Sequence, residues 1–157
     1  MRKARLEIKD REELEEILST NVICRLAMVD EGMPYLLPFN YGYRDGIIFI
    51  HSAPEGRKID ILRKNPEVCF EVEDRVEVVK AERACGWSTR YRSVVGYGLV
   101  EIKGTPVDKQ QGLEVIMAGH GAPHLVDFEP KDLRNMLILK LSITSMSGKH
   151  SANWNRQ

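Results

Sequence analysis

The sequence of 157 residues lacks long apolar runs and any excess of one charge. Its apolar stretches, such as residues 22–29 and 46–50, are far shorter than the ~20 residues that a membrane-spanning helix needs. Its 23 basic and 23 acidic side chains balance, with no basic stripe, so we expect neither nucleic acid nor a membrane as a partner. The charged N-terminal residues do not resemble a secretory signal. We therefore expect a cytoplasmic protein.

Cysteines and metal-binding patterns are sparse. Cys24, Cys69 and Cys85 form no Cys-x-x-Cys pair, and the first two lie in apolar runs, where cysteine usually behaves as a small buried hydrophobe. His120 and His124 are four residues apart, but the glycine and proline between them would break a helix, so we predict no metal site. A nucleotide-hydrolase phosphate loop, a Rossmann fingerprint and a Ser-His-Asp elbow are also missing from the sequence.

What the sequence does contain is a series of short strand-like segments with few helices between them. Asp10 is a candidate N-cap, with Glu13 placed as in a capping box, and it precedes a helix with an apolar stripe. An Asp-Gly pair at residues 45–46 predicts a hairpin, so the first three strands are interpreted as an antiparallel meander. Strands are predicted at residues 22–29, 35–43, 47–50, 68–72, 91–103 and 136–146, helices at 57–65 and 106–118, and a loop at 119–130. Residues 73–86 fit either a ragged strand or a loop.

This order favours a mainly β fold with a few helices: a six-stranded antiparallel barrel in a single domain over residues 1–157, with a core over about residues 5–149 and a flexible C-terminal tail. The segment 47–50 is apolar on both faces of its strand. Such a strand needs the barrel interior on one side and a helix or a second subunit on the other. A homodimer is therefore a reasonable expectation.

The most informative segment is residues 51–58, of sequence HSAPEGRK, between an apolar strand and a short helix. Cations are ordinarily disfavoured at a helix N-terminus, because the positive end of the helix dipole lies there. Arg57 and Lys58, behind a glycine and near the hydroxyl of Ser52, make sense if an anion such as phosphate lies between them. The alternative is that both cations are simply solvated.

Taken with NPEVCF at residues 65–70 and RYRSVVGYG at residues 90–98, this segment resembles the FMN-binding split barrels of the pyridoxamine-phosphate-oxidase type. The likeness is strongest to their nitroimidazole-resistance (Nim) branch and extends over about residues 5–149. It implies an FMN-binding split β-barrel, a homodimer with the flavin at the subunit interface, and reduction of a small flat acceptor such as a nitroaromatic. The Arg-x-x-x-Leu-Lys strand of the true oxidases is missing, which argues against oxidation of pyridoxamine phosphate.

The resemblance implies a phosphate end of the cofactor site. Arg57 and Lys58 would hold the FMN phosphate, the arginine through two hydrogen bonds and the lysine as a point charge, and Ser52 could add a hydroxyl. Ile50 and His51 correspond to the loop entrance. His51 is the catalytic candidate, because an imidazole there could bind substrate or transfer a proton near neutral pH. The alternative is a packing histidine.

The resemblance also implies a ring end of the site. Pro38, Phe39 and Asn40, on a strand expected to pair with residues 46–51, would run along the isoalloxazine ring. Asn40 could instead bond its own backbone. Ser93 stands where the oxidases carry a glutamine that touches the flavin from the second subunit. Arg92 lies among apolar residues, which favours an interface or a site over a surface ion pair.

The aromatic and glycine residues of the same region each allow two interpretations. Trp87, Tyr91 and Tyr97 could stack on a flat ligand, although a core position is favoured for Tyr97. Gly96 and Gly98 share one face of a strand and indicate a bulge or barrel corner more than close approach to a ligand.

A second functional hypothesis is non-enzymatic. On the same fold the protein could be a flavin or haem carrier or a redox sensor, with His51, His120 or His124 as an axial haem ligand.

Overall fold

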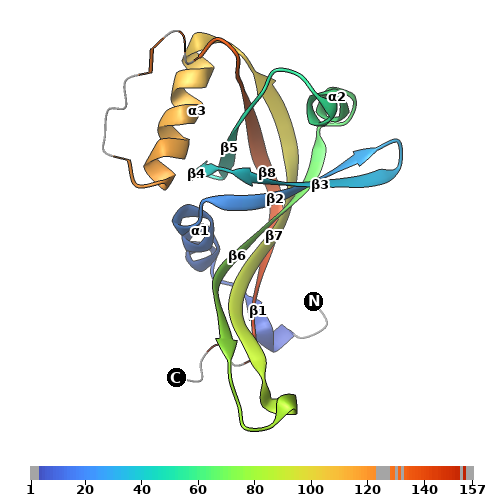
Figure 1. The fold of residues 1–157 in the computed structure, drawn as a ribbon, viewed down its shortest axis with the longest axis vertical. Coiled ribbons are helices and arrows are strands. Elements are labelled where there is room, and N and C mark those ends of the chain that lie inside the picture. Colours follow the sequence, from blue (N-terminus) through green and yellow to red (C-terminus); the bar gives the residue numbers. More distant parts are fainter. Residues whose placement is uncertain (1–3, 123–127, 130, 132, 153, 155–157) are drawn as a thin grey trace.

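The computed structural model describes residues 4–122, 128–129, 131, 133–152 and 154 (Figure 1). In chain order its elements are a 3-10 helix (Ala4–Leu6), β1 (Glu7–Ile8), α1 (Arg11–Thr20), β2 (Ile23–Asp30), β3 (Met33–Asn40), β4 (Gly42–Arg44), β5 (Ile47–Ser52), α2 (Arg57–Lys64), β6 (Glu67–Val79), a 3-10 helix (Ala84–Gly86), β7 (Ser88–Lys103), α3 (Pro106–Gly119) and β8 (Leu137–His150). No helix in these described stretches is long and apolar enough to cross a membrane.

The strands form one antiparallel sheet in the order β3-β2-β6-β7-β8-β5-β4, with β1 paired to β8. The mainly β, antiparallel class is confirmed, but the predicted number of six strands is wrong, since the described residues form eight. One extra strand is the two-residue β1, which is too short to leave a periodic pattern. The other arises because the strand predicted at residues 35–43 breaks into β3 and β4.

The break at Tyr41 moves the chain from one end of the sheet to the other. Asn40, the last residue of β3, pairs with β2, whereas Gly42, the first residue of β4, pairs with β5. The predicted meander is therefore wrong. So is the predicted pairing of Pro38, Phe39 and Asn40 with residues 46–51, because these three residues pair with residues 23–25 of β2. Residues 42–44 alone of this stretch pair with β5, and the hydrogen-bonded path of the sheet does not close.

Buried contacts with two helices fix this break. Tyr41 is fully buried, and its hydroxyl donates to the carbonyl oxygen of Leu18 at the end of α1 over 2.7 Å. Burial raises the pKa of the Tyr41 hydroxyl well above its usual range, so this group stays a donor. A Cβ on Gly42 would collide with the α3 backbone at Val115 and Ile116. The crossing is therefore clamped between α1 and α3.

The helix ends largely follow the sequence signals. The Asp10 side chain caps α1 by accepting from the N–H of Glu12 over 3.0 Å, and the predicted apolar stripe of this helix is buried. At α3, Thr105 and Asp108 form a reciprocal capping box, with Pro106 as the first helical residue. Both helices therefore begin where a short polar side chain satisfies the first backbone donors.

Strand β5 is covered on both faces, as its sequence requires. Ile48 and Ile50 face the main core, whereas Phe49 packs with Val115 and Ile116 of α3 in a second cluster. Helix α3 therefore supplies the cover on the second face.

The undecided segment 73–86 becomes the end of a long hairpin. Strand β6 continues to Val79 through a bulge at Arg75, whose φ is +50°, and a 3-10 turn then leads into β7. Residues 75–91, which we call the arm, project away from the body of the protein, at the bottom of Figure 1. Farther along β7, its register with β8 shifts between Tyr97 and Gly98, which confirms the predicted bulge.

The three cysteines are free thiols in different settings. Cys24 is fully buried, as predicted, and burial raises the pKa of its thiol to about 12. Cys69 is half-buried and Cys85 is exposed in the arm, so neither is a core residue.

The Tyr41 contact predicts a measurable loss of stability. In Tyr41→Phe the carbonyl of Leu18 loses its buried donor, and we expect the free energy of unfolding in urea to fall by about 1–2 kcal/mol. The control is Ser19→Ala, which removes an exposed hydroxyl from the same helix end, and there we expect a change below about 0.5 kcal/mol. Equal stabilities of the two variants would contradict this role of Tyr41.

Candidate functional site

The N-terminus of α2 is open to an anion. Its N-cap is Gly56, with φ of 110°, and no side chain caps the helix. The Gly56 carbonyl already accepts from the N–H groups of Ile59 and Asp60. The N–H groups of Arg57 and Lys58 have no acceptor within the helix, so they point toward whatever lies ahead of it. At Gly56 itself, an added Cβ would meet no atom within 4 Å, which leaves the approach clear.

Arg57 is held beside this helix end by the β2–β3 hairpin. Its Nε donates to Oδ2 of Asp30 over 3.0 Å, and its guanidinium lies 4.5 Å from the centre of the Tyr35 ring. The terminal nitrogens of Arg57 make no hydrogen bond within the described part of the chain. They remain able to bind two oxygens of an anion, and the side chain is already oriented for it. Neither Asp30 nor Tyr35 was predicted from the sequence, because nothing local links a turn at residue 30 to a helix at residue 57.

The other residues of the predicted phosphate end lie nearby in the chain. Lys58 is half-buried and forms no ion pair with any described residue. Ser52 is buried, and its hydroxyl donates to the carbonyl oxygen of Ala53 over 2.9 Å, so it would have to rotate to meet a phosphate. His51 is exposed at the end of β5, where it pairs with Ile138 of β8. The side chain of Ile50 is fully buried and faces the core.

The predicted ring end lies on the edge strand β3. Pro38 and Asn40 are exposed, whereas Phe39 is half-buried and packs against the main core. Tyr35, on the same strand, lies under Arg57. The structure therefore brings β3 and the start of α2 together, although not through the strand pairing predicted from the sequence. Asn40 makes no side-chain hydrogen bond to another described residue, so its predicted local bond is not seen.

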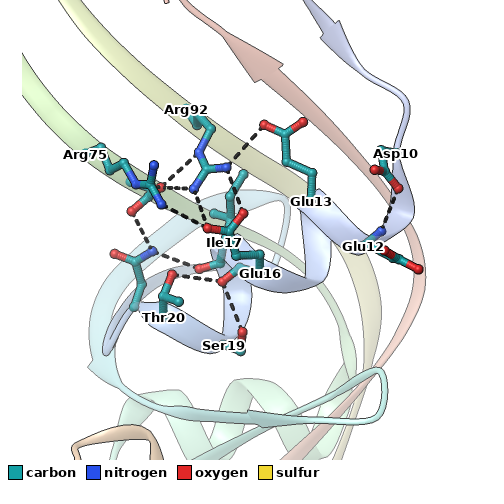
Figure 2. Close-up of polar contacts among 11 residues, drawn as sticks. Asp10, Glu12, Glu13, Glu16, Ile17, Ser19, Thr20, Arg75 and Arg92 are labelled. Carbon is teal, nitrogen blue, oxygen red and sulfur yellow. Dashed lines mark hydrogen bonds and ion pairs between the residues drawn. The ribbon is translucent and has the colours of Figure 1, made fainter.

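Arg92 lies in a buried ion-pair cluster, shown in Figure 2. The residue is 3% exposed, and its Nε donates to Oδ2 of Asp74 over 3.0 Å. A terminal nitrogen lies 3.2 Å from Glu13 and 3.1 Å from Glu16, both on α1. Arg75 adds a bond of 2.9 Å to Glu16. These contacts join α1 to β6 and β7 at the point where the arm leaves the body.

This cluster lies far from the strand residues that follow α2. Arg92 is seven positions along β7 from Leu99, which pairs with Glu67 just after α2, and a strand rises ~3.3 Å per residue. Its charge is already balanced by carboxylates, as the ion-pair alternative expected, but Arg92 is buried and is not a surface residue. A cofactor contact of Arg92 stays a prediction that no observed contact supports.

A broad apolar surface, which we call the outer face, runs across β3, β2, β6 and β7. The register aligns Leu36, Ala27, Cys69 and Tyr97 in one row across these strands. Tyr97 is 59% exposed, so the predicted core position for it is wrong. The exposed large apolar residues of this face are Ile23, Val29, Leu36, Val95, Tyr97 and Leu99.

One polar group interrupts the outer face. Arg25 lies 3.1 Å from Glu71 and 2.9 Å from Glu73. Partial burial, followed by the neighbouring Glu73, raises the pKa of the Glu71 carboxyl. Ser93 pairs with Glu73, so it lies on this face and not at the start of α2.

A model of the family described as pyridoxamine 5'-phosphate oxidase matches residues 10–150. An uncharacterized protein of Rhizobium meliloti is 31% identical over 65 residues, which are 41% of this chain and 42% of that protein. The chain thus matches less than half the length of this relative.

Solved structures are similar over nearly the whole chain. A candidate 5-nitroimidazole antibiotic resistance protein of Bacteroides thetaiotaomicron is 29% identical, with a TM-score of 0.81 over 92% of this chain and 86% of that one. An FAD and haem binding protein of Mycobacterium smegmatis is 25% identical, with a TM-score of 0.78 over 94% and 74%. The flavocytochrome Anf3 of Azotobacter vinelandii, 21% identical, shares the fold with a TM-score of 0.80 over 97% and 72%.

The Arg92 cluster predicts a large stability effect. Arg92→Met would remove the nearest cation from the buried Asp74 carboxylate, which would keep only Asn21 at 3.3 Å and Arg75 at 3.5 Å, and we expect the free energy of unfolding to fall by about 3 kcal/mol. The control is Arg11→Met, which removes an exposed ion pair with Glu15 and should cost less than about 0.5 kcal/mol.

The same cluster predicts a pH dependence. Hydrogen bonding to Arg92, and then its charge, lowers the pKa of the Glu16 carboxyl below its ordinary 4.5. The ionised form therefore favours the fold, and this contribution is complete above pH 4.5 and is lost as the pH falls through the folded-state pKa. We expect urea unfolding of the parent between pH 6 and 3 to show this loss, and a smaller slope in Arg92→Met. Identical slopes would contradict the assignment.

Proposed function

Because the chain belongs to the pyridoxamine 5'-phosphate oxidase family, we propose that it binds FMN, with the phosphate at the N-terminus of α2, and acts as an oxidoreductase. The observation that carries this proposal is the uncapped helix start at Gly56, followed directly by Arg57 and Lys58. Anions bind well at such a position, where backbone donors and the helix dipole act together.

The residues present fit a phosphate. The helix start supplies backbone donors, Arg57 offers two unused nitrogens in a planar fork, and Lys58 adds a charge. Asp30 and Tyr35 hold the Arg57 side chain in place before a ligand arrives, which lowers the entropy lost on binding. The free edge of β3 at residues 38–40 would lie beside the ring, since β3 is the last strand at its end of the sheet.

A bound flavin supplies the electron transfer, while the protein supplies binding, orientation and electrostatics. His51 is exposed next to this region, and an imidazole can give or take a proton near neutral pH. We assign it the delivery of a proton to the reduced acceptor. The acceptor we propose is a small flat nitroaromatic, such as a nitroimidazole, which the 29% identity to the Bacteroides thetaiotaomicron protein supports.

For the assembly we propose a cytoplasmic homodimer that buries the outer face, with the flavin at the subunit interface. Six large apolar side chains are exposed on that face, including Leu36 at 58% and Tyr97 at 59%. Patches of this kind mark interaction sites on soluble proteins. Three free cysteines suit a reducing compartment.

Removing both cations at the helix start should abolish tight FMN binding. We expect Arg57→Ala with Lys58→Ala to weaken FMN affinity about 100-fold or more in a fluorescence titration, because two charge-assisted hydrogen-bonding groups are lost. The control is Arg63→Ala with Lys64→Ala, which removes the same charge from the other end of α2, where the ion partners are exposed Asp60 and Glu31. If both double variants bind FMN equally well, the phosphate assignment is wrong.

A change at His51 should separate binding from turnover. We expect His51→Ala to bind FMN like the parent but to reduce a nitroaromatic about 100-fold more slowly, since a positioned proton donor is lost. His120→Ala, at an exposed histidine on the end of α3, serves as the control and should keep full turnover.

The absorption spectrum of the isolated protein tests the alternative cofactor. Twin visible flavin bands support the proposal, whereas a haem Soret band without them would favour the haem-carrier hypothesis, with His51 or His120 as the axial ligand. His124, the third candidate, lies outside the described residues.

A further inference from the structure

The arm, residues 75–91, has almost no packing of its own. Every residue from Arg75 to Thr89 is exposed except Val79, which is half-buried. Two-stranded hairpins are at best marginally stable in water, because they have no second layer to cover either face. An arm of this length would therefore gain stability by packing against another surface.

Its exposed side chains include large apolar ones. Val76 is 59% exposed, Val78 is 60% exposed and Trp87 is 51% exposed. Exposed apolar residues gathered on a projecting ribbon are typical of a surface that is covered by a partner. Tryptophan is also among the residues most enriched at the energetic centres of interfaces.

The arm is held in a fixed direction at its base. Asp74 and Arg92 lie directly before and after it and are bonded to each other, and Arg75 is bonded to Glu16 of α1. An ion pair of 3.0 Å between Glu77 and Arg90 joins its two strands. The arm therefore presents its apolar side chains in one orientation, which suits a specific partner surface.

We infer that the arm of one copy lies across the outer face of a second copy, so that two arms clasp the dimer reciprocally. This inference rests on the dimer of the proposed function. The first support is continuity: Val78 pairs with Thr89, and Thr89 lies on the same side of β7 as Ser93 and Val95 because strand side chains alternate. The outer face therefore continues onto the arm.

The second support is charge complementarity. The arm carries four basic residues and two acidic ones, a net charge of +2 from Arg75, Lys80, Arg83 and Arg90 against Glu77 and Glu82. The outer face across β3, β2, β6 and β7 up to Leu99 carries three acidic residues and one basic one, a net charge of −2 from Glu67, Glu71 and Glu73 against Arg25. In a two-fold dimer each arm meets the opposite face, so opposite charges meet twice.

The test measures dimer dissociation by analytical ultracentrifugation over a range of concentrations. We expect Val78→Ser with Trp87→Ser to raise the dimer dissociation constant about tenfold or more. The control is Val107→Ser, which removes an equally exposed valine (64%) from α3 and should leave the constant unchanged. FMN affinity is measured on the same samples.

A second measurement leaves the arm intact. In a Trp154→Phe background, Trp87 reports alone, and its fluorescence should shift to shorter wavelength as the dimer forms. A dimer that keeps its parent dissociation constant in the arm variant, or a Trp87 emission that does not change with concentration, overturns the clasp alone. A parent that stays monomeric at every concentration overturns the clasp and the dimer, and a parent that binds no FMN overturns the proposed cofactor.

Discussion

The hydrogen bond from the Tyr41 hydroxyl to the end of α1 fixes the crossing on which the rest of the fold depends. Up to Asn40 the chain pairs with β2, and from Gly42 it pairs with β5 at the opposite end of the sheet. Because β5 runs directly into α2, the crossing decides where the start of that helix lies. It places Arg57 against Asp30 and Tyr35 of the β2–β3 hairpin, and so assembles the proposed anion site from segments that are separate in the sequence.

The local parts of the fold could be predicted from the sequence, since they depend on neighbouring residues. Helix α2 begins at Arg57 as expected, the Asp45-Gly46 turn forms a hairpin, and the N-cap of α1 is Asp10. Strand pairing could not be predicted, because the alternation of exposed and half-buried residues along β3 would suit pairing with β2 or with β5. The observed pairing depends on the burial of Tyr41 and on the close approach of α3 to Gly42. Both are contacts between residues that are distant in the sequence.

In the candidate site, too, local features could be predicted and contacts between distant residues could not. The cations at residues 57 and 58 were predicted as a pair at a helix start, and the structure shows this start uncapped. The partners of Arg92 could not be foreseen, because Glu13 and Glu16 belong to a helix nearly eighty positions earlier and carry no sign of that role. Tyr97 was expected inside on its aromatic character alone, yet its strand parity turns it outward.

The close packing of the α3 backbone against Gly42 limits which residues related proteins can carry at this position. The atoms that a side chain at residue 42 would meet are main-chain atoms of α3, so no change of rotamer could make room for it. A related chain with a larger residue there must carry its third helix farther from the sheet, and the cluster around Phe49 would then admit solvent. Glycine at this one site is thus a marker for family members that keep a dry layer beneath that helix.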